Sequence, residues 1–292
     1  MIPKIIHYCW LSSDPVPEDL QIYMKSWKEK LPDYEFIKWD FSKFDKESSA
    51  WVSEAFDHKK YAFACDYIRI YAVYNYGGIY MDMDMEVLKR FDDLLDNPTM
   101  FAYERPDHTW IEAGCFGAEK HNPFLKRCLD RYEGRHFVRK DNSLDVLPLP
   151  RVMDDVVRDN NLTIKAYPWT YFTAKSYETG IEAPTSDTYT IHHFAGSWKS
   201  SKEQEIYNKA VNLRKFPLIG KAIAFVYEKT GKAVYVMKNE GVAELVSRIR
   251  TFLQQSSYFE GTSRTEVAAR DGGLPEKRQK AGRDNDVFGA LN

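Results

Sequence analysis

The strongest constraint on the fold is a helical pattern that ends in two glycines and leads into an acidic segment. Apolar residues recur at helical spacing from Lys59 to Tyr76. Gly77 and Gly78 then predict the end of this helix, because glycine readily adopts the left-handed backbone of helix C-termini. Ile79 to Met81 predicts a short buried strand that runs directly into the acidic residues Asp82 to Glu86. Since ligands bind beyond the carboxyl ends of strands in open α/β sheets, the acidic segment is expected at a functional edge.

The N-terminal forty residues predict a βαβ unit. Lys4 to Trp10 and Tyr34 to Trp39 are apolar runs typical of strands, and Pro17 to Lys30 carries apolar residues at helical spacing. Such a crossover between parallel strands is right-handed in nearly all proteins. Further strands are predicted at 100–103, 162–167 and 188–193, and further helices at 123–132 and 148–159. The chain is therefore expected to form an α/β sheet flanked by helices.

Three parts of the chain differ in composition. Residues 1–200 carry the α/β pattern and are expected to form the catalytic domain. Residues 201–255 predict a helical extension in which basic residues flank apolar patches. Residues 256–292 are poor in hydrophobic residues and are expected to be a disordered tail.

Composition excludes several classes of protein. The formal net charge of −2 is unlike that of nucleic-acid-binding proteins, which carry a basic excess. The four cysteines form no C-x-x-C pair, so neither a zinc knuckle nor a redox motif is indicated, and a reduced, cytoplasmic compartment fits. The N-terminus does not read as a signal peptide, and no apolar run approaches the roughly 20 residues that span a bilayer.

The residues with the clearest chemistry are Asp82 and Asp84. On an extended segment, side chains at i and i+2 point to the same side. Two carboxylates placed in this way suit Mg²⁺ or Mn²⁺, although a D-x-D sequence alone is also common in surface turns. The preceding helix adds Asp66 and Arg69, which share one helical face at i and i+3. Read alone, that pair would be an ordinary surface ion pair.

Residues 64–88, ACDYIRIYAVYNYGGIYMDMDMEVL, resemble the DxD-containing sugar-binding region of glycosyltransferase family 32. The family pattern is roughly S-D-x-x-R followed by Y-G-G-x-Y-x-D-x-D, and Cys65 is the one polar position that departs from it. Two further segments are similar to the family's opening strand and its closing H-x-x-x-S-W motif, namely PKIIHYCW at 3–10 and IHHFAGSW at 191–198. The resemblance covers about residues 1–200. It weakens on the acceptor side, where Leu149-Pro150-Arg151 stands in place of a T-G-P motif.

The resemblance implies a GT-A-type Rossmann-like mixed sheet and a retaining, metal-dependent hexosyltransferase. It implies a nucleotide-sugar donor, a UDP-hexose before a GDP-sugar, and a glycan or lipid-linked acceptor, with bacterial capsule or lipopolysaccharide synthesis as the setting. Asp66 and Arg69 would hold the donor sugar, with Arg69 near the diphosphate. Asp84 would bind the cation, and Asp82 would contact the ribose or the cation.

The resemblance also implies roles for residues at the two ends of the domain. Trp10 would flank the nucleobase, unless it is a core tryptophan. His193 would complete the metal shell; His192 is the alternative, because strand alternation allows only one of the two to face the site. Ser197 and Trp198 would close over the diphosphate.

The same-face mechanism is favoured for retention, because no convincing nucleophile is evident. Glu104 and Glu112 are candidates that the sequence does not distinguish from surface carboxylates. Two other classes stay open: a non-catalytic nucleotide-sugar-binding protein and a D-x-D phosphohydrolase. The phosphohydrolase is disfavoured because Glu86 stands where that class has threonine or valine. The apolar segment at 216–227, with basic flanks, raises peripheral contact with the inner membrane face as a further hypothesis.

Overall fold

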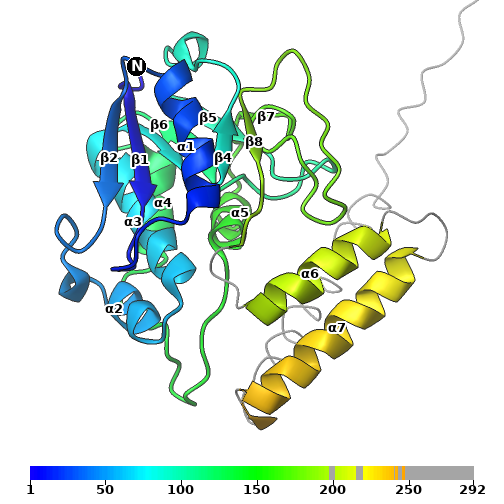
Figure 1. The fold of residues 1–292 in the computed structure, drawn as a ribbon. Coiled ribbons are helices and arrows are strands. Elements are labelled where there is room, and N and C mark those ends of the chain that lie inside the picture. Colours follow the sequence, from blue (N-terminus) through cyan, green and yellow to red (C-terminus); the bar gives the residue numbers. More distant parts are fainter. Residues whose placement is uncertain (197–200, 215–219, 240, 243–244, 247–292) are drawn as a thin grey trace, which may run out of the picture. The chain divides into compact units, whose positions relative to one another are not determined.

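The computed structural model describes residues 1–196, 201–214, 220–239, 241–242 and 245–246. Its centre is a six-stranded mixed sheet in the order β2-β1-β3-β6-β5-β7 (Figure 1). The strands are β1 (Ile5–Cys9), β2 (Glu35–Trp39), β3 (Gly78–Met81), β5 (Thr99–Ala102), β6 (Cys115–Ala118) and β7 (Ala166–Tyr167). β1 pairs in parallel with β2 and β3, whereas β6 is antiparallel to both β3 and β5.

Helices cover both faces of this sheet. They are α1 (Glu18–Lys30), α2 (Ala50–Asp57), α3 (Tyr61–Tyr76), α4 (Pro123–Asp130) and α5 (Leu149–Asp159). One apolar core joins Trp51 of α2, Ile68 of α3 and Leu125 of α4 to Tyr80 of the sheet. The other core joins Trp27 of α1 to strand residues that include Ile79. Neighbouring residues of β3 thus point to opposite faces, as strand geometry requires. The predicted α/β class, with a mixed sheet flanked by helices, is confirmed.

A second, two-stranded antiparallel sheet lies beside the first. It pairs β4 (Met85–Val87) with β8 (Thr190–His192), with Met85 opposite His192. The strand predicted at 188–193 is therefore present but joins β4 and not the main sheet. The strand predicted at 162–167 is shortened to its last two residues. The sequence analysis did not predict α2, β4 or β6.

The Gly77-Gly78 pair ends α3 because both residues adopt left-handed backbone, with φ of 68° and 105°. A Cβ on Gly78 would lie 2.7 Å from the carbonyl oxygen of Ile5 and 3.2 Å from Nε2 of His7. His7 is fully buried, and its Nε2 lies 2.8 Å from the Gly77 carbonyl oxygen. The indole of Trp39 donates a hydrogen bond to Nδ1 of His7 at 3.1 Å. The glycines thus bring β1 and β3 close enough to pair.

By its internal contacts the chain divides into two compact units, Met1–Asn239 and Glu240–Asn292. The first unit includes α6 (Ser201–Arg214) and α7 (Gly220–Asn239), so the predicted helical extension is present over these residues. The Tyr207 hydroxyl of α6 donates a hydrogen bond to the Tyr177 carbonyl oxygen at 2.7 Å. The predicted disordered tail at 256–292 lies outside the described residues. Within the described part of the chain, every helix is too short or too polar to cross a bilayer.

Candidate metal and donor site

Asp82 and Asp84 lie where the chain leaves β3, in a turn and not on an extended strand. The Met85 amide donates to the Asp82 carbonyl oxygen at 3.1 Å, which closes the turn. The Asp82 amide donates to the Gly114 carbonyl oxygen at 2.7 Å and so fixes where the turn begins. One ligand atom from each of Asp82, Asp84 and His192 lies within 4.8 Å of the other two. The expected side-by-side placement of the carboxylates is therefore reached through a turn.

His192, and not His193, faces the two aspartates. Nε2 of His192 lies 3.6 Å from Oδ1 of Asp84. The His193 ring instead lies 2.8 Å from a carboxylate oxygen of Glu86 and stacks on Tyr23 at a centroid distance of 4.2 Å. The sequence analysis preferred His193 as the metal ligand, but the structure turns the alternative, His192, toward the aspartates. β8 pairs with β4 in a register that turns the His192 ring inward and the His193 ring outward.

Glu112 holds the other side of the His192 ring. Nδ1 of His192 lies 3.3 Å from Oε1 of Glu112. Glu112 also accepts hydrogen bonds from the Gly114 amide and the Thr173 hydroxyl, each at 2.6 Å, and is 1% exposed. A carboxylate on one ring nitrogen orients the other nitrogen toward a metal and raises its basicity. Glu112 is therefore a positioning residue, and its enclosure leaves it no access to a substrate as a nucleophile.

Arg69 and Asp66 lie beside the acidic turn on α3. Arg69 donates to Oδ2 of Asp82 at 3.2 Å and to the Ala113 carbonyl oxygen at 2.8 Å, and its guanidinium lies 3.3 Å from Asp66. Asp66 accepts a hydrogen bond from the Leu149 amide at 3.1 Å. Both side chains are at most 10% exposed. Arg69 and Asp66 thus form a buried ion pair. The sequence alone was also compatible with an ordinary pair on the surface.

The electrostatics of the site reflect burial opposed by charged neighbours. Burial raises the pKa of Asp66 to about 6, although the Arg69 charge acts to lower it. Burial also raises the pKa of Asp82, again against Arg69. Burial alone would lower the pKa of His192, but Glu112 and Asp84 outweigh it and raise that pKa to about 10. The site therefore holds an excess of negative charge that a proton on His192 partly balances.

Gly114 leaves room for this arrangement. A Cβ at this position would lie 2.8 Å from Cε1 of His192, 2.9 Å from Oε1 of Glu112 and 3.1 Å from Oδ2 of Asp82. These distances are shorter than ordinary van der Waals contact, so any side chain here would displace the site. Sequence reasoning missed Gly114 as a site residue and did not separate Glu112 from surface carboxylates. Their only local signal is the short E-x-G spacing before a strand.

Of the remaining predicted site residues, Trp10 and Glu104 are among those that the structure describes. Trp10 follows β1, is partly buried, and donates its indole N–H to the Asp14 carbonyl oxygen at 2.7 Å. Its predicted contact with the nucleobase stays a prediction. Ser197 and Trp198 lie outside the described residues. Glu104 lies on the loop before Glu112, and burial raises its pKa to about 7.

The donor atoms fit a divalent cation. Asp82, Asp84 and His192 offer carboxylate oxygen and imidazole nitrogen, a set that suits Mn²⁺ and, through oxygen, Mg²⁺. The Ala195 amide donates to Oδ2 of Asp84 at 2.8 Å and leaves Oδ1 toward His192. The carboxylate of Glu112 contacts the ring nitrogen of His192 that faces away from the aspartates, which is the partner that a metal-binding histidine ordinarily has.

Comparison with known proteins concerns the segment that carries the two aspartates of this site. Residues 17–101 match the family described as "Glycosyltransferase sugar-binding region containing DXD motif". Inositol phosphoceramide mannosyltransferase 2 of Schizosaccharomyces pombe is 32% identical over 139 residues, which are 46% of this chain and 39% of that protein. Mannosyl phosphorylinositol ceramide synthase SUR1 of Saccharomyces cerevisiae is 29% identical over 133 residues, which are 44% and 34%.

A solved structure, the PaToxG glycosyltransferase, aligns with a TM-score of 0.43 and 21% identity over 55% of this chain and 70% of that one. The matches to the two fungal proteins span less than half of each relative's length. The matched family segment contains Asp66, Arg69, Asp82 and Asp84, whereas Glu112 and His192 lie beyond it. Residues 17–101 of this chain thus match the glycosyltransferase family defined by the DXD-containing sugar-binding region.

Proposed function

We propose that this protein is a divalent-metal-dependent glycosyltransferase that takes a hexose from a nucleotide-sugar donor and retains its anomeric configuration. The observation that carries the proposal is the convergence of Asp82, Asp84 and His192 beside Arg69. Arg69 and both aspartates lie in the segment that matches the family. Asp82, Asp84 and His192 would hold a divalent cation, which would supply charge neutralisation for the diphosphate leaving group. The runner-up functions, a nucleotide-sugar-binding protein and a phosphohydrolase, become outcomes of the test.

The protein's own residues divide the work as follows. Arg69, fixed by Asp66, Asp82 and the Ala113 carbonyl, presents a positive charge beside the acidic turn and stabilises the departing diphosphate. Asp66 positions Arg69, and its oxygens retain lone pairs that can accept hydroxyl groups of the donor sugar. Glu112 holds His192 in the orientation that binds the cation. Glu112 is enclosed, and the exposed carboxylate of Glu86 is engaged by the His193 ring, which favours attack from the leaving-group face.

The relatives refine the choice of donor and acceptor. One fungal protein is named as an inositol phosphoceramide mannosyltransferase and the other as a mannosyl phosphorylinositol ceramide synthase. We therefore place a mannosyl donor before the UDP-hexoses that the sequence resemblance put first. An acceptor carried on a lipid agrees with these names. A surface-polysaccharide intermediate is the acceptor that the sequence resemblance implied.

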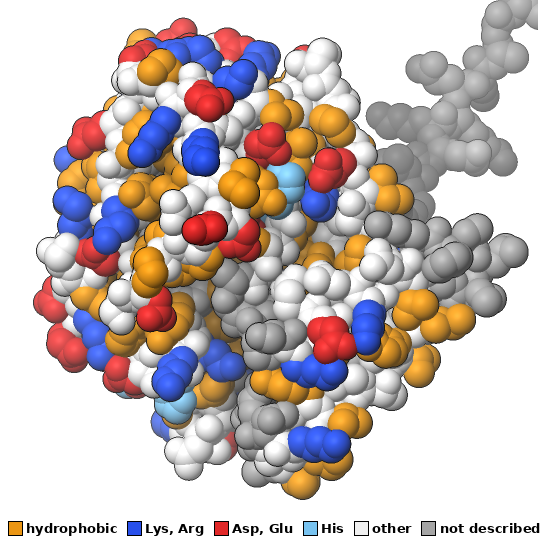
Figure 2. Space-filling view, viewed as in Figure 1, with side chains coloured by type: hydrophobic (Ala, Val, Ile, Leu, Met, Phe, Trp, Pro, Cys, Tyr) orange, Lys and Arg blue, Asp and Glu red, His pale blue; other side chains and the backbone are white. Residues whose placement is uncertain are grey.

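The exposed side of α7 supports contact with a lipid surface. Ile223, Val226, Val234 and Met237 recur at helical spacing and are 45–59% exposed. Figure 2 shows hydrophobic side chains among Lys and Arg over this part of the molecule. Such an amphipathic face can lie in a membrane interface. Flotation with vesicles of anionic lipid should recover the full chain but not a Val226→Glu, Val234→Glu variant; equal recovery of both would contradict the proposal.

Donor hydrolysis tests the function directly. Purified protein is incubated with Mn²⁺ and one of five donors, and nucleotide release is followed. The donors are GDP-mannose, UDP-glucose, UDP-galactose and the N-acetylamino forms of the two UDP-sugars. Release from one donor should stop on chelation and in Asp84→Asn, and continue in Asp96→Asn, which changes an exposed aspartate outside the site. Donor binding without release would support the binding protein. Release of inorganic phosphate from a phosphomonoester would support the phosphohydrolase.

A further inference from the structure

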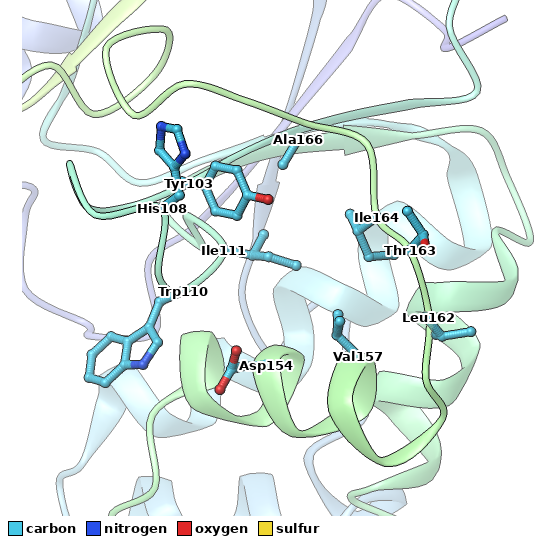
Figure 3. A pocket seen from close by; sticks show the side chains of 10 residues that line it. All are labelled: Tyr103, His108, Trp110, Ile111, Asp154, Val157, Leu162, Thr163, Ile164 and Ala166. Atoms are coloured by element: carbon cyan, nitrogen blue, oxygen red, sulfur yellow. The ribbon is translucent and has the colours of Figure 1, made fainter. Parts of the chain in front are cut away.

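One cavity, lined in part by Ile111 next to Glu112, is unassigned by the proposed metal and donor chemistry. It has a volume of about 270 Å³ and is formed by the loop 103–111, α5 and residues 162–166 (Figure 3). This volume lies just below the roughly 300–1,000 Å³ of pockets for drug-sized ligands. The cavity therefore suits a single ring and not a whole nucleotide sugar.

The walls of this cavity combine aromatic rings with hydrogen-bonding groups. Tyr103 and His108 stack at a centroid distance of 5.0 Å, and Trp110 forms one side. Tyr103 and Thr163 line the cavity, and within the described parts of the chain their hydroxyls have no hydrogen-bond partner. Figure 3 shows Asp154 on α5 between Trp110 and Val157. Apolar ring faces together with free hydroxyls and a carboxylate suit a polyhydroxylated ring.

The loop that carries the aromatic residues is held in an uncommon conformation. His108 and Trp110 both have φ of 58°, a left-handed backbone that is a marked outlier for a bulky residue such as tryptophan. The Tyr103–Ile111 bridge and the hydrogen bond from the Glu104 amide to the Trp110 carbonyl oxygen, 2.8 Å long, fix the loop. Arg105 lies 3.9 Å from the Trp110 ring centroid and supports that ring. Backbone strain of this kind is concentrated at ligand-binding sites.

The same two segments build both the cavity and the acidic site. Ile111 lines the cavity, and the next residue, Glu112, positions His192. On α5, the Leu149 amide binds Asp66, and Asp154 follows five residues later, about 7.5 Å along the helix. The cavity and the Asp66–Arg69 pair are thus connected through α5, and the cavity and Glu112 through the backbone that follows Ile111.

We propose that the cavity formed by Tyr103, Trp110, Asp154 and Thr163 is the subsite for the six-membered polyol ring of the acceptor. This proposal rests on the proposed glycosyltransferase function and adds where the acceptor ring binds. A pyranose and an inositol ring share the chemistry that these walls recognise. The ring's hydroxyls bond to Tyr103, Thr163 and Asp154, while its apolar face packs on the aromatic side chains.

Saturation-transfer NMR on the full chain tests the subsite with two probes, methyl α-mannopyranoside and myo-inositol. Tyr103→Phe combined with Thr163→Val removes two hydroxyls and keeps the side-chain shapes. We expect saturable binding of at least one probe to the wild type and at least a tenfold weaker affinity in the double variant. Thr230→Val, the same exchange on the exposed side of α7, should bind as the wild type does. The probe that binds distinguishes a sugar acceptor from an inositol acceptor.

Absence of binding by both probes, or equal affinity in the wild type and the double variant, would overturn the subsite. Donor hydrolysis measured on the same preparations separates this failure from failure of the function. Equal donor hydrolysis in the wild type and the double variant, with polyol binding lost, supports an acceptor subsite. Polyol binding that depends on the two hydroxyls, without hydrolysis of any donor, would keep the cavity as a polyol site and overturn its role in transfer.

Discussion

His7 is fully buried and the His192 side chain is only 11% exposed, yet the pKa values of the two histidines move in opposite directions. Burial lowers the pKa of His7 to about 4, and the Gly77 carbonyl only partly opposes it. Burial also acts against the charged form of His192, but Glu112 and Asp84 raise its pKa to about 10. His7 thus serves the packing of β1 against β3 as a neutral ring, whereas His192 belongs to a charged site. The comparison shows that its neighbours, and not burial, decide whether a histidine here is structural or functional.

Removal of His192 should have the largest effect. His192→Ala deletes one of the three candidate ligands, so Mn²⁺ affinity should fall by at least about 100-fold, the upper end of what is lost when only the hydrogen-bond partner of a ligand is removed. Isothermal titration calorimetry measures the affinity. His193→Ala is the matched control, because that ring contacts Glu86 and Tyr23, and it should change the affinity by less than about threefold. The reverse ranking would restore His193 as the ligand.

His7 should make the stability of the protein depend on pH in a defined window. The pKa of His7 is lowered in the folded state. Between pH 6.5 and about 4, His7 is therefore protonated in the unfolded chain but stays neutral in the folded protein. Stability therefore falls as the pH drops through this window, by about 3 kcal/mol in all. Protonation would set a second N–H of His7 against the Trp39 indole, which already donates to Nδ1.

Urea unfolding of the wild type and His7→Gln at several pH values isolates this contribution as the difference between the two curves. His58→Gln, which replaces an exposed histidine, should follow the wild type. A constant difference between wild type and His7→Gln from pH 7 to pH 4 would show that His7 does not titrate as described.

Glu112→Gln should weaken the site without removing a ligand. The amide can no longer fix the His192 ring as a carboxylate does, so Mn²⁺ affinity and donor hydrolysis should fall about 10- to 100-fold. Glu86→Gln makes the same exchange at the partner of His193 and should leave both quantities nearly unchanged. Equal losses in the two variants would mean that overall charge, and not the orientation of His192, sets the affinity.

Gly114→Ala should have the smallest effect of the four, about a tenfold loss of Mn²⁺ affinity. The new methyl group would lie 2.8 Å from the His192 ring and push it from the aspartates. Gly231→Ala adds a methyl group 3.3 Å from the buried Ile206 side chain, which belongs to α6 and not to the metal site, and should leave the affinity unchanged. Metal titration that finds Gly114→Ala equal to the wild type would show that the site adapts around an added side chain.

Sequence patterns predicted what depends on local spacing. The helix at 59–76 corresponds to α3, its glycine stop is present, and Asp82 and Asp84 follow β3 as expected. The βαβ unit at the N-terminus is likewise confirmed. The sequence did not reveal what depends on pairing between distant segments. Whether His192 or His193 faces the aspartates depends on the register of β8 against β4, and the role of Glu112 depends on that same pairing. A one-residue change of register exchanges the two faces of a strand.

The pairing of β4 with β8 also determines when the site can exist. The His193 and Ala195 amides bind Asp84 across more than a hundred residues of chain, at 3.0 and 2.8 Å. A chain growing from its N-terminus contains both aspartates long before it contains the segment that encloses them. Contacts of such long sequence separation form late because loop closure must come first. The cation site is therefore expected to assemble only after residue 195 has emerged, so that metal uptake reports completion of the fold.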